Sequence, residues 1–142
     1  MSIAIIIIYT AILVAISVVD IKHRLILDKI SYPAMGVALL LAPFGSSGLL
    51  LSLAGGAAGF ILMALYMKLS NGAGFGDVKL AALVGLMVGF PDVLLVICLS
   101  CIISAIIASV IIRLKKENEV PFAPAMALAT VSTLCWQIRG IG

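Results

Sequence analysis

The stretch NGAGFGDVK, residues 71–79, lies between two apolar runs. It therefore marks the point where one predicted helix ends and the next begins. Three glycines in this stretch allow backbone angles that other residues rarely adopt, and apolar residues begin directly after Asp77. We therefore expect a glycine-rich loop that delivers one carboxylate to the start of an apolar helix. Within a membrane, irregular backbone is tolerated only where it lines a cavity or is buried in protein. The candidate counterpart of Asp77 is Asp20, which ends the first apolar run.

The composition indicates a membrane protein. Of the 142 residues, 64% are hydrophobic and 11% are charged, and the mean hydropathy is +1.34. Because about a quarter of the residues in a soluble domain are charged, these values exclude an ordinary soluble fold and predict a chain surrounded by a lipid bilayer. The basic residues flank apolar runs instead of forming a patch with interleaved aromatic residues, so we expect no nucleic-acid partner.

Apolar runs, five of them without charge and the fourth with Lys79 at its start, predict an all-α integral membrane protein, a six-transmembrane-helix bundle that forms a single domain over residues 1–142. The expected spans are residues 3–19, 32–44, 49–67, 78–90, 93–112 and 122–138. The second span covers only about 20 Å at 1.5 Å per residue, so its flanks must extend it or the bilayer must thin around it. Glycines four residues apart, Gly55 with Gly59 and Gly85 with Gly89, predict that neighbouring helices approach closely.

The distribution of Lys and Arg gives the expected orientation. If six spans alternate between the two sides of the membrane, Arg139 lies on one face and eight basic residues lie on the other. Those eight are Lys22, Arg24, Lys29, Lys68, Lys79, Arg113, Lys115 and Lys116. Because loops rich in Lys and Arg stay in the cytoplasm, we expect both termini outside and the ends that carry Asp20 and Asp77 at the cytoplasmic face. Helix packing can then set the two aspartates side by side, a contact that the sequence permits without establishing it.

Two neighbouring carboxyl groups can hydrolyse a peptide bond. Both cannot ionise cheaply, so one keeps its proton while the other takes a proton from the attacking water. The protonated member polarises the scissile carbonyl or later protonates the leaving amine. Such a pair needs no metal and no other cofactor. Which aspartate holds the proton stays open, because a coupled pair titrates as a unit.

Each of these residues also has a plain structural interpretation. Asp20 can mark a membrane boundary, and Asp77 can cap the helix that it begins, because Asp suits the positive end of a helix. Lys79 fits a side chain that extends to the membrane surface, and Asp28 fits a solvated position inside the linker. The three cysteines and His23 lack the spacing of a zinc site, so we expect the cysteines to pack as small apolar residues.

Three motifs together resemble the type IV prepilin peptidase and preflagellin peptidase family, whose members are GxGD intramembrane aspartic proteases. GFGD at residues 74–77, followed by VKL, is similar to the family's signature. DIKHR at residues 20–24 is similar to its first-aspartate motif, and PFAP at residues 121–124 resembles the Pro-Phe-x-Pro opening of its last helix. The three motifs occur in the family's order and cover nearly the whole chain.

The resemblance implies that Asp20 and Asp77 are the catalytic pair. It further implies a prokaryotic plasma-membrane enzyme that cleaves prepilin-like proteins after a glycine, at the cytoplasmic face, and so removes a short basic leader. The remaining candidate residues of the substrate-binding loop and site are Gly74, Phe75, Gly76, Lys79, Pro121, Phe122 and Pro124.

The chain departs from the family's pattern at two points. Leu27-Asp28 stands where many relatives have Pro-Asn, so the turn of the linker is expected to differ. The cytoplasmic insertion with two Cys-x-x-Cys pairs, which bifunctional relatives use for N-methylation, has no counterpart in this sequence. The resemblance is therefore to the short, peptidase-only branch, such as the enzymes of tight-adherence (Flp) pili, and we expect no methylation.

Two other classes of function stay open. A small transporter or channel subunit also uses intramembrane carboxylates and glycine-rich breaks to bind cations. Its broken helices usually come in pairs near the middle of the bilayer, whereas the acids here are expected at one face. A non-catalytic assembly factor, which holds a partner at its cytoplasmic face, is the third class. The sequence leaves the oligomeric state open.

Overall fold

The computed structural model describes residues 2–23, 28–45, 48–70, 75–115 and 123–141. Within these ranges every regular element is helical and no strand occurs, which confirms the predicted all-α class. The elements in chain order are α1 (Ile3–His23), α2 (Asp28–Leu41), the 3-10 helix η1 (Ala42–Phe44), α3 (Gly48–Ser70), α4 (Phe75–Val88), α5 (Asp92–Lys115) and α6 (Ala123–Ile141).

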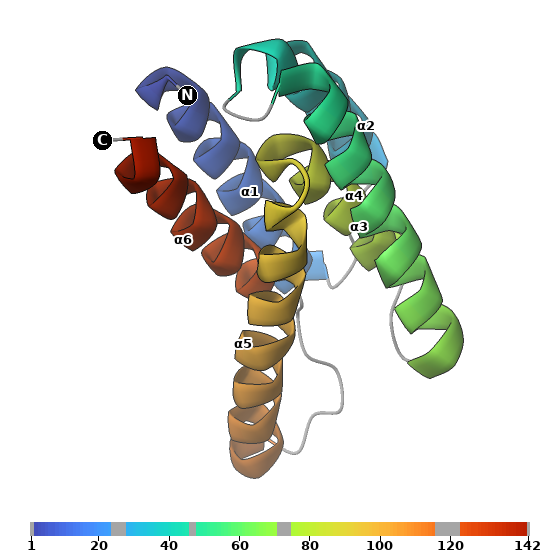
Figure 1. Ribbon diagram of the computed structural model, residues 1–142. Helices are drawn as coiled ribbons and strands as arrows, with labels where there is room; N and C mark the ends of the chain where they lie inside the picture. Colours follow the sequence, from blue (N-terminus) through green and yellow to red (C-terminus); the bar gives the residue numbers. More distant parts are fainter. Residues whose placement is uncertain (1, 24–27, 46–47, 71–74, 116–122, 142) are drawn as a thin grey trace.

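Successive helices run in alternating directions, so that both termini lie at the same end of the bundle (Figure 1). The ends of α1, α3 and α5 and the starts of α2, α4 and α6 lie toward the other end. The lower half of α5 extends away from the rest of the bundle in this view. The alternation brings residues far apart in the sequence, such as the last turn of α1 and the first turn of α4, to one end of the molecule.

Helix α4 is short, yet it lies at the centre of the core. It packs against α2, α3, α5 and α6. Its buried residues are Val78, Leu80, Ala81, Ala82, Leu83, Val84, Gly85, Met87 and Val88. A helix that is apolar on all sides must be surrounded by protein or by lipid, and α4 is surrounded by protein. The other helices complete the core with Tyr9 and Leu13 from α1, Ala38 from α2 and Met126 from α6.

Glycines bring α3 and α4 into backbone contact. A Cβ atom built at Gly55 would lie 2.7 Å from the carbonyl carbon of Gly89, and one built at Gly85 would lie 2.8 Å from the backbone nitrogen of Gly56. A Cβ atom at Gly59 would likewise collide with the backbone of Ala81. Both predicted glycine pairs therefore lie at the same helix crossing, and the prediction of close approach is confirmed.

A tight turn joins α4 to α5 and is held by two other helices. Gly89 has φ +83°, in the left-handed region that favours glycine, and its backbone N–H donates to the Gly85 carbonyl at 2.8 Å. The N–H of Phe90 donates to the Leu51 carbonyl of α3 at 2.9 Å. Gln137 of α6 donates from Nε2 to the Val88 carbonyl at 3.2 Å and also bonds Oδ2 of Asp92, so α6 anchors the turn.

Several helices extend beyond the apolar runs that predicted them. The first predicted span ends at residue 19, but α1 continues to His23. Similarly, α2 begins at Asp28 instead of residue 32, and α4 begins at Phe75 instead of residue 78. Helical hydrogen bonds join backbone groups, so a helix continues through polar residues where the surroundings allow it. Hydropathy therefore marks the apolar part of each helix and not its ends.

The surface of the bundle is suited to lipid. In the part of the chain that the structure describes, α3 and α5 are long and apolar enough to cross a membrane, and residues 3–19 and 29–44 form shorter apolar helices. Large apolar side chains are exposed on α3 and α5, including Leu50, Ile61, Leu65, Leu95, Ile102 and Ile106. The three cysteines, expected to pack as small apolar residues, are free thiols on the exposed surface. Lipid-facing apolar surface of this kind indicates a membrane protein.

Candidate functional site

Asp77 is the third residue of α4, and its side chain is half-buried. The first turn of a helix carries unpaired backbone N–H groups and a partial positive charge, which stabilise a carboxylate. On either side of Lys79, Val78 and Leu80 are fully buried and fix the rotation of this turn. Asp77 therefore lies at the start of an apolar helix, as predicted, whereas residues 71–74 of the predicted loop lie outside the described residues.

Asp20 lies in α1, three residues before the helix ends at His23. Helix α1 packs against α2 and α6, and α4 packs against the same two helices. The last turn of α1 and the first turn of α4 also lie toward the same end of the bundle (Figure 1). Asp20 and Asp77 are thus carried toward one end of the bundle by two helices that share both neighbours.

Lys79 connects the starts of α4 and α2. Its ammonium lies 5.1 Å from the centre of the Tyr32 ring and 5.9 Å from the centre of the Phe75 ring. Both distances fall within the range of a cation–π interaction. Because Tyr32 lies near the start of α2 and Phe75 begins α4, the contact brings the N-terminal ends of the two helices side by side. The sequence predicts that Lys79 extends to the membrane surface, but nothing in the sequence pattern points to these two aromatic partners.

The other predicted residues divide into two groups. Phe75 and Gly76 lie in the first turn of α4, so the glycine expected in an irregular loop is helical. Pro124 is the second residue of α6 and is half-buried, a position where proline needs no N–H partner. Gly74, Pro121 and Phe122, and with them most of the predicted loop, lie outside the described residues.

Basic residues gather at the end of the bundle that carries Asp20 and Asp77. Lys22, Lys29, Lys68 and Arg113 are exposed there, near the ends of α1, α3 and α5 and the start of α2. Arg139 lies near the end of α6, at the opposite end with the termini. The helix directions thus separate these charges as the alternating order of spans predicts.

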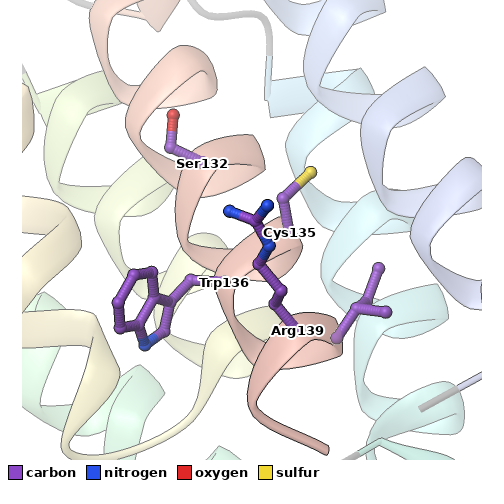
Figure 2. A pocket seen from close by; sticks show the side chains of 5 residues that line it. Ser132, Cys135, Trp136 and Arg139 are labelled. Atoms are coloured by element: carbon purple, nitrogen blue, oxygen red, sulfur yellow. The ribbon is translucent and has the colours of Figure 1, made fainter. Parts of the chain in front are cut away.

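A hollow of about 470 Å³ lies on α6, away from this end. Figure 2 shows Ser132, Cys135, Trp136 and Arg139 around it, all on the C-terminal half of one helix. Helix α6 ends beside the N-terminus in Figure 1, so the hollow lies at the end of the bundle opposite the first turn of α4. It contains none of the predicted site residues.

Comparison with known proteins gives one consistent result. The family described as "Type IV leader peptidase family" matches residues 7–109, a range that includes both Asp20 and Asp77. The chain is 32% identical over 134 residues to the prepilin leader peptidase/N-methyltransferase of Stutzerimonas stutzeri, covering 87% of this chain and 46% of that protein. It is 31% identical over 134 residues to the protein of the same name from Bacillus subtilis, with 88% and 52% covered.

A third relative, from Pseudomonas aeruginosa, carries the same name and is 31% identical over 134 residues, with 87% of this chain and 46% of that protein covered. The chain therefore spans about half the length of the curated relatives that it matches. No solved structure matches the chain.

Proposed function

The chain belongs to the type IV leader peptidase family, and from this membership we propose that it is an aspartic endopeptidase that removes the basic leader of prepilin-like proteins. Cleavage follows a glycine at the cytoplasmic face of a prokaryotic plasma membrane. The observation that carries the proposal is the position of Asp20 and Asp77 toward one end of the bundle, on two helices that share α2 and α6 as neighbours.

In the proposed reaction the two aspartates act as one acid–base pair. The ionised carboxylate takes a proton from a water molecule, whose oxygen attacks the carbonyl carbon of the scissile peptide. The protonated carboxyl group polarises that carbonyl and then gives its proton to the leaving nitrogen as the C–N bond breaks. Either aspartate can hold the shared proton, because a coupled pair titrates as a unit.

The proposed membrane arrangement has six spans with both termini outside. It is supported by the alternating helix directions and by the collection of Lys22, Lys29, Lys68 and Arg113 at one end. In this orientation Asp20 and Asp77 are reached from the cytoplasm, where a basic leader would be presented. We also propose that residues 1–142 form one peptidase domain, since all six helices contribute to a single core.

The test is leader removal by the purified protein in lipid vesicles. The substrate is a pilin precursor whose basic leader ends in glycine, and the mass of the product is followed for wild type, Asp20→Asn and Asp77→Asn. We expect wild type to cut after the glycine and each variant to lose at least about 10³-fold in rate, because an amide preserves size but cannot exchange the required proton.

Asp28→Asn is the matched control, since it removes a neighbouring carboxylate that the proposal leaves out of the reaction. It should cut at close to the wild-type rate. Near-normal cleavage by Asp20→Asn or Asp77→Asn would exclude the two-aspartate mechanism. A folded, membrane-inserted wild type that leaves the precursor intact would favour a transporter subunit or an assembly factor instead.

A further inference from the structure

Ser31 carries a buried hydroxyl group without a hydrogen-bond partner among the described residues. Its side chain is 1% exposed, and its Oγ is the one buried side-chain polar atom there that lacks a partner. Buried polar groups are nearly always paired in folded proteins, because an unpaired one loses its bonds to water without replacement. An exception of this kind calls for a physical explanation.

Three other buried hydroxyl groups, those of Ser100, Thr130 and Thr133, are paired within their own helices, and the buried Tyr9 hydroxyl donates to the Ala38 carbonyl of α2. Ser100 donates to the Val96 carbonyl at 2.6 Å, and Thr130 donates to the Met126 carbonyl at 2.7 Å. In each case the acceptor lies four residues earlier in the same helix. Ser31 is the fourth residue of α2, so the carbonyl four residues earlier lies before the helix begins. The position of Ser31 in the first turn thus leaves its hydroxyl available for a partner from outside α2.

The surroundings of Ser31 point to the candidate site. The next residue, Tyr32, contacts the Lys79 ammonium, so the N-terminal end of α2 lies beside the N-terminal end of α4, which carries Asp77. Ser31 is buried on the same side of α2 as Ala34 and Ala38, three and seven residues later. Helix α2 packs against both α1 and α4. The hydroxyl therefore lies inside the bundle, at the level of Asp77, on the helix that contacts both aspartate-bearing helices.

We propose that Ser31 is a substrate-binding residue, whose hydroxyl forms a hydrogen bond with the main chain of the peptide held for cleavage; this inference rests on the proposed leader-peptidase function. A peptide that enters a helical bundle meets walls whose backbone groups are already paired within helices. Its own N–H and C=O groups must find side-chain partners. A serine hydroxyl can donate to a peptide carbonyl or accept from a peptide N–H, and Ser31 holds neither bond within the described part of the chain.

The test compares Ser31→Ala with wild type in the leader-cleavage assay over a range of precursor concentrations. We expect KM to rise about fivefold and kcat to stay within about twofold, because a hydrogen bond present in both the ground state and the transition state contributes to binding alone. The thermal unfolding midpoint should stay unchanged or rise, since alanine removes an unpaired hydroxyl and favours a helix. Ser31→Thr keeps the hydroxyl and should retain KM closer to wild type.

Ser100→Ala is the matched control, because it deletes a buried hydroxyl that is paired within its own helix. It should leave KM and kcat unchanged. Unchanged KM and kcat in Ser31→Ala would overturn the inference. A fall in kcat with KM unchanged would also overturn it, because the hydroxyl would then act on the attacking water and not in substrate binding. A lower unfolding midpoint in Ser31→Ala would also overturn it by showing a structural partner.

Wild type and Asp77→Asn are measured in the same series. If wild type cleaves the precursor and Asp77→Asn does not, the proposed function is supported whatever Ser31→Ala does. Unchanged kinetics in Ser31→Ala would then overturn only the inference about Ser31. If wild type does not cleave, the proposed function and the inference that rests on it both fall.

Discussion

The Lys79 ammonium lies over the ring of Tyr32, 5.1 Å from its centre, although 47 residues separate the two in the sequence. The contact joins the first turn of α4 to the start of α2 only two residues beyond Asp77. It also keeps a positive charge at a defined place near the candidate carboxylate. Lys79 is therefore held by aromatic rings, which distinguishes it from a lysine that only extends to the membrane surface.

Replacing Tyr32 with leucine should weaken the hold on Lys79. A cation–π contact at a partly exposed site contributes about 0.5–1 kcal/mol, so we expect a small loss of unfolding free energy and a several-fold loss of leader cleavage. Tyr32→Phe keeps the ring and should behave like wild type. Unfolding in detergent and initial cleavage rates measure the two effects, and Tyr66→Leu, at another half-exposed tyrosine, controls for loss of an aromatic side chain. Equal activity in Tyr32→Leu and wild type would contradict a role for the contact.

Adding one methyl group at Gly55 should destabilise the protein. The new Cβ atom would collide with the backbone of Gly85 and Gly89, which cannot move aside as a flexible side chain can. Overpacking of this kind typically costs about 1–3 kcal/mol, and it should also reduce cleavage because α4 carries Asp77. The thermal unfolding midpoint of Gly55→Ala is the measurement.

Gly36→Ala is the control with the opposite expected sign. A Cβ atom at this position in α2 has no heavy atom within 4 Å, so alanine should stabilise the helix by up to about 1 kcal/mol. If both variants shifted the midpoint in the same direction, the close contact of α3 and α4 would not explain the result.

Gln137→Leu should destabilise the turn between α4 and α5. The substitution removes the donor that now bonds both Asp92 and the Val88 carbonyl. Loss of such bonds at a half-buried site costs about 1–3 kcal/mol. Asp92→Asn keeps an oxygen acceptor for the amide and should cost less. Both are compared by thermal unfolding, and a larger effect for Asp92→Asn would show that the charge of Asp92 matters more than its bond to Gln137.

Cleavage should continue after divalent metals are removed. Two aspartates that share one proton activate water without a Lewis acid, so dialysis against a chelator should leave the rate within about twofold of its starting value. The rate of leader removal before and after treatment is the measurement. A large loss that added metal reverses would contradict the two-aspartate mechanism and would leave Asp20 and Asp77 as candidate ligands.

Local features of the helices were predictable from the sequence. Apolar runs identified the existence and order of the helices, because long apolar runs have few other stable forms in lipid. The glycine pairs predicted a close crossing, and the gap between the spans 78–90 and 93–112 corresponds to the junction of α4 and α5. Helix ends were predicted less well. The predicted spans leave Asp20 and Asp77 just outside the first and fourth helices. In the structure both residues lie inside these helices.

The packing partners of each helix were not predictable. Most of these helices are apolar on all sides, so no periodic pattern distinguishes a buried face from a lipid-facing one. The central position of α4 and the exposure of most of α5 follow from contacts between elements and not from local composition. Ser31 and Tyr32 were missed for the same reason. The alternation of spans was the available signal, since it places the start of the second helix at the same end as Asp77.

The glycine crossing also limits how the molecule can open. Because no layer of side chains lies between α3 and α4 around Gly55 and Gly85, neither helix can roll or slide against the other without a collision of main chains. The two helices therefore form a rigid pair, and Asp77 is fixed to that pair. Any movement that changes access to Asp77 must therefore come from the helices around this pair, while α3 and α4 move as one body.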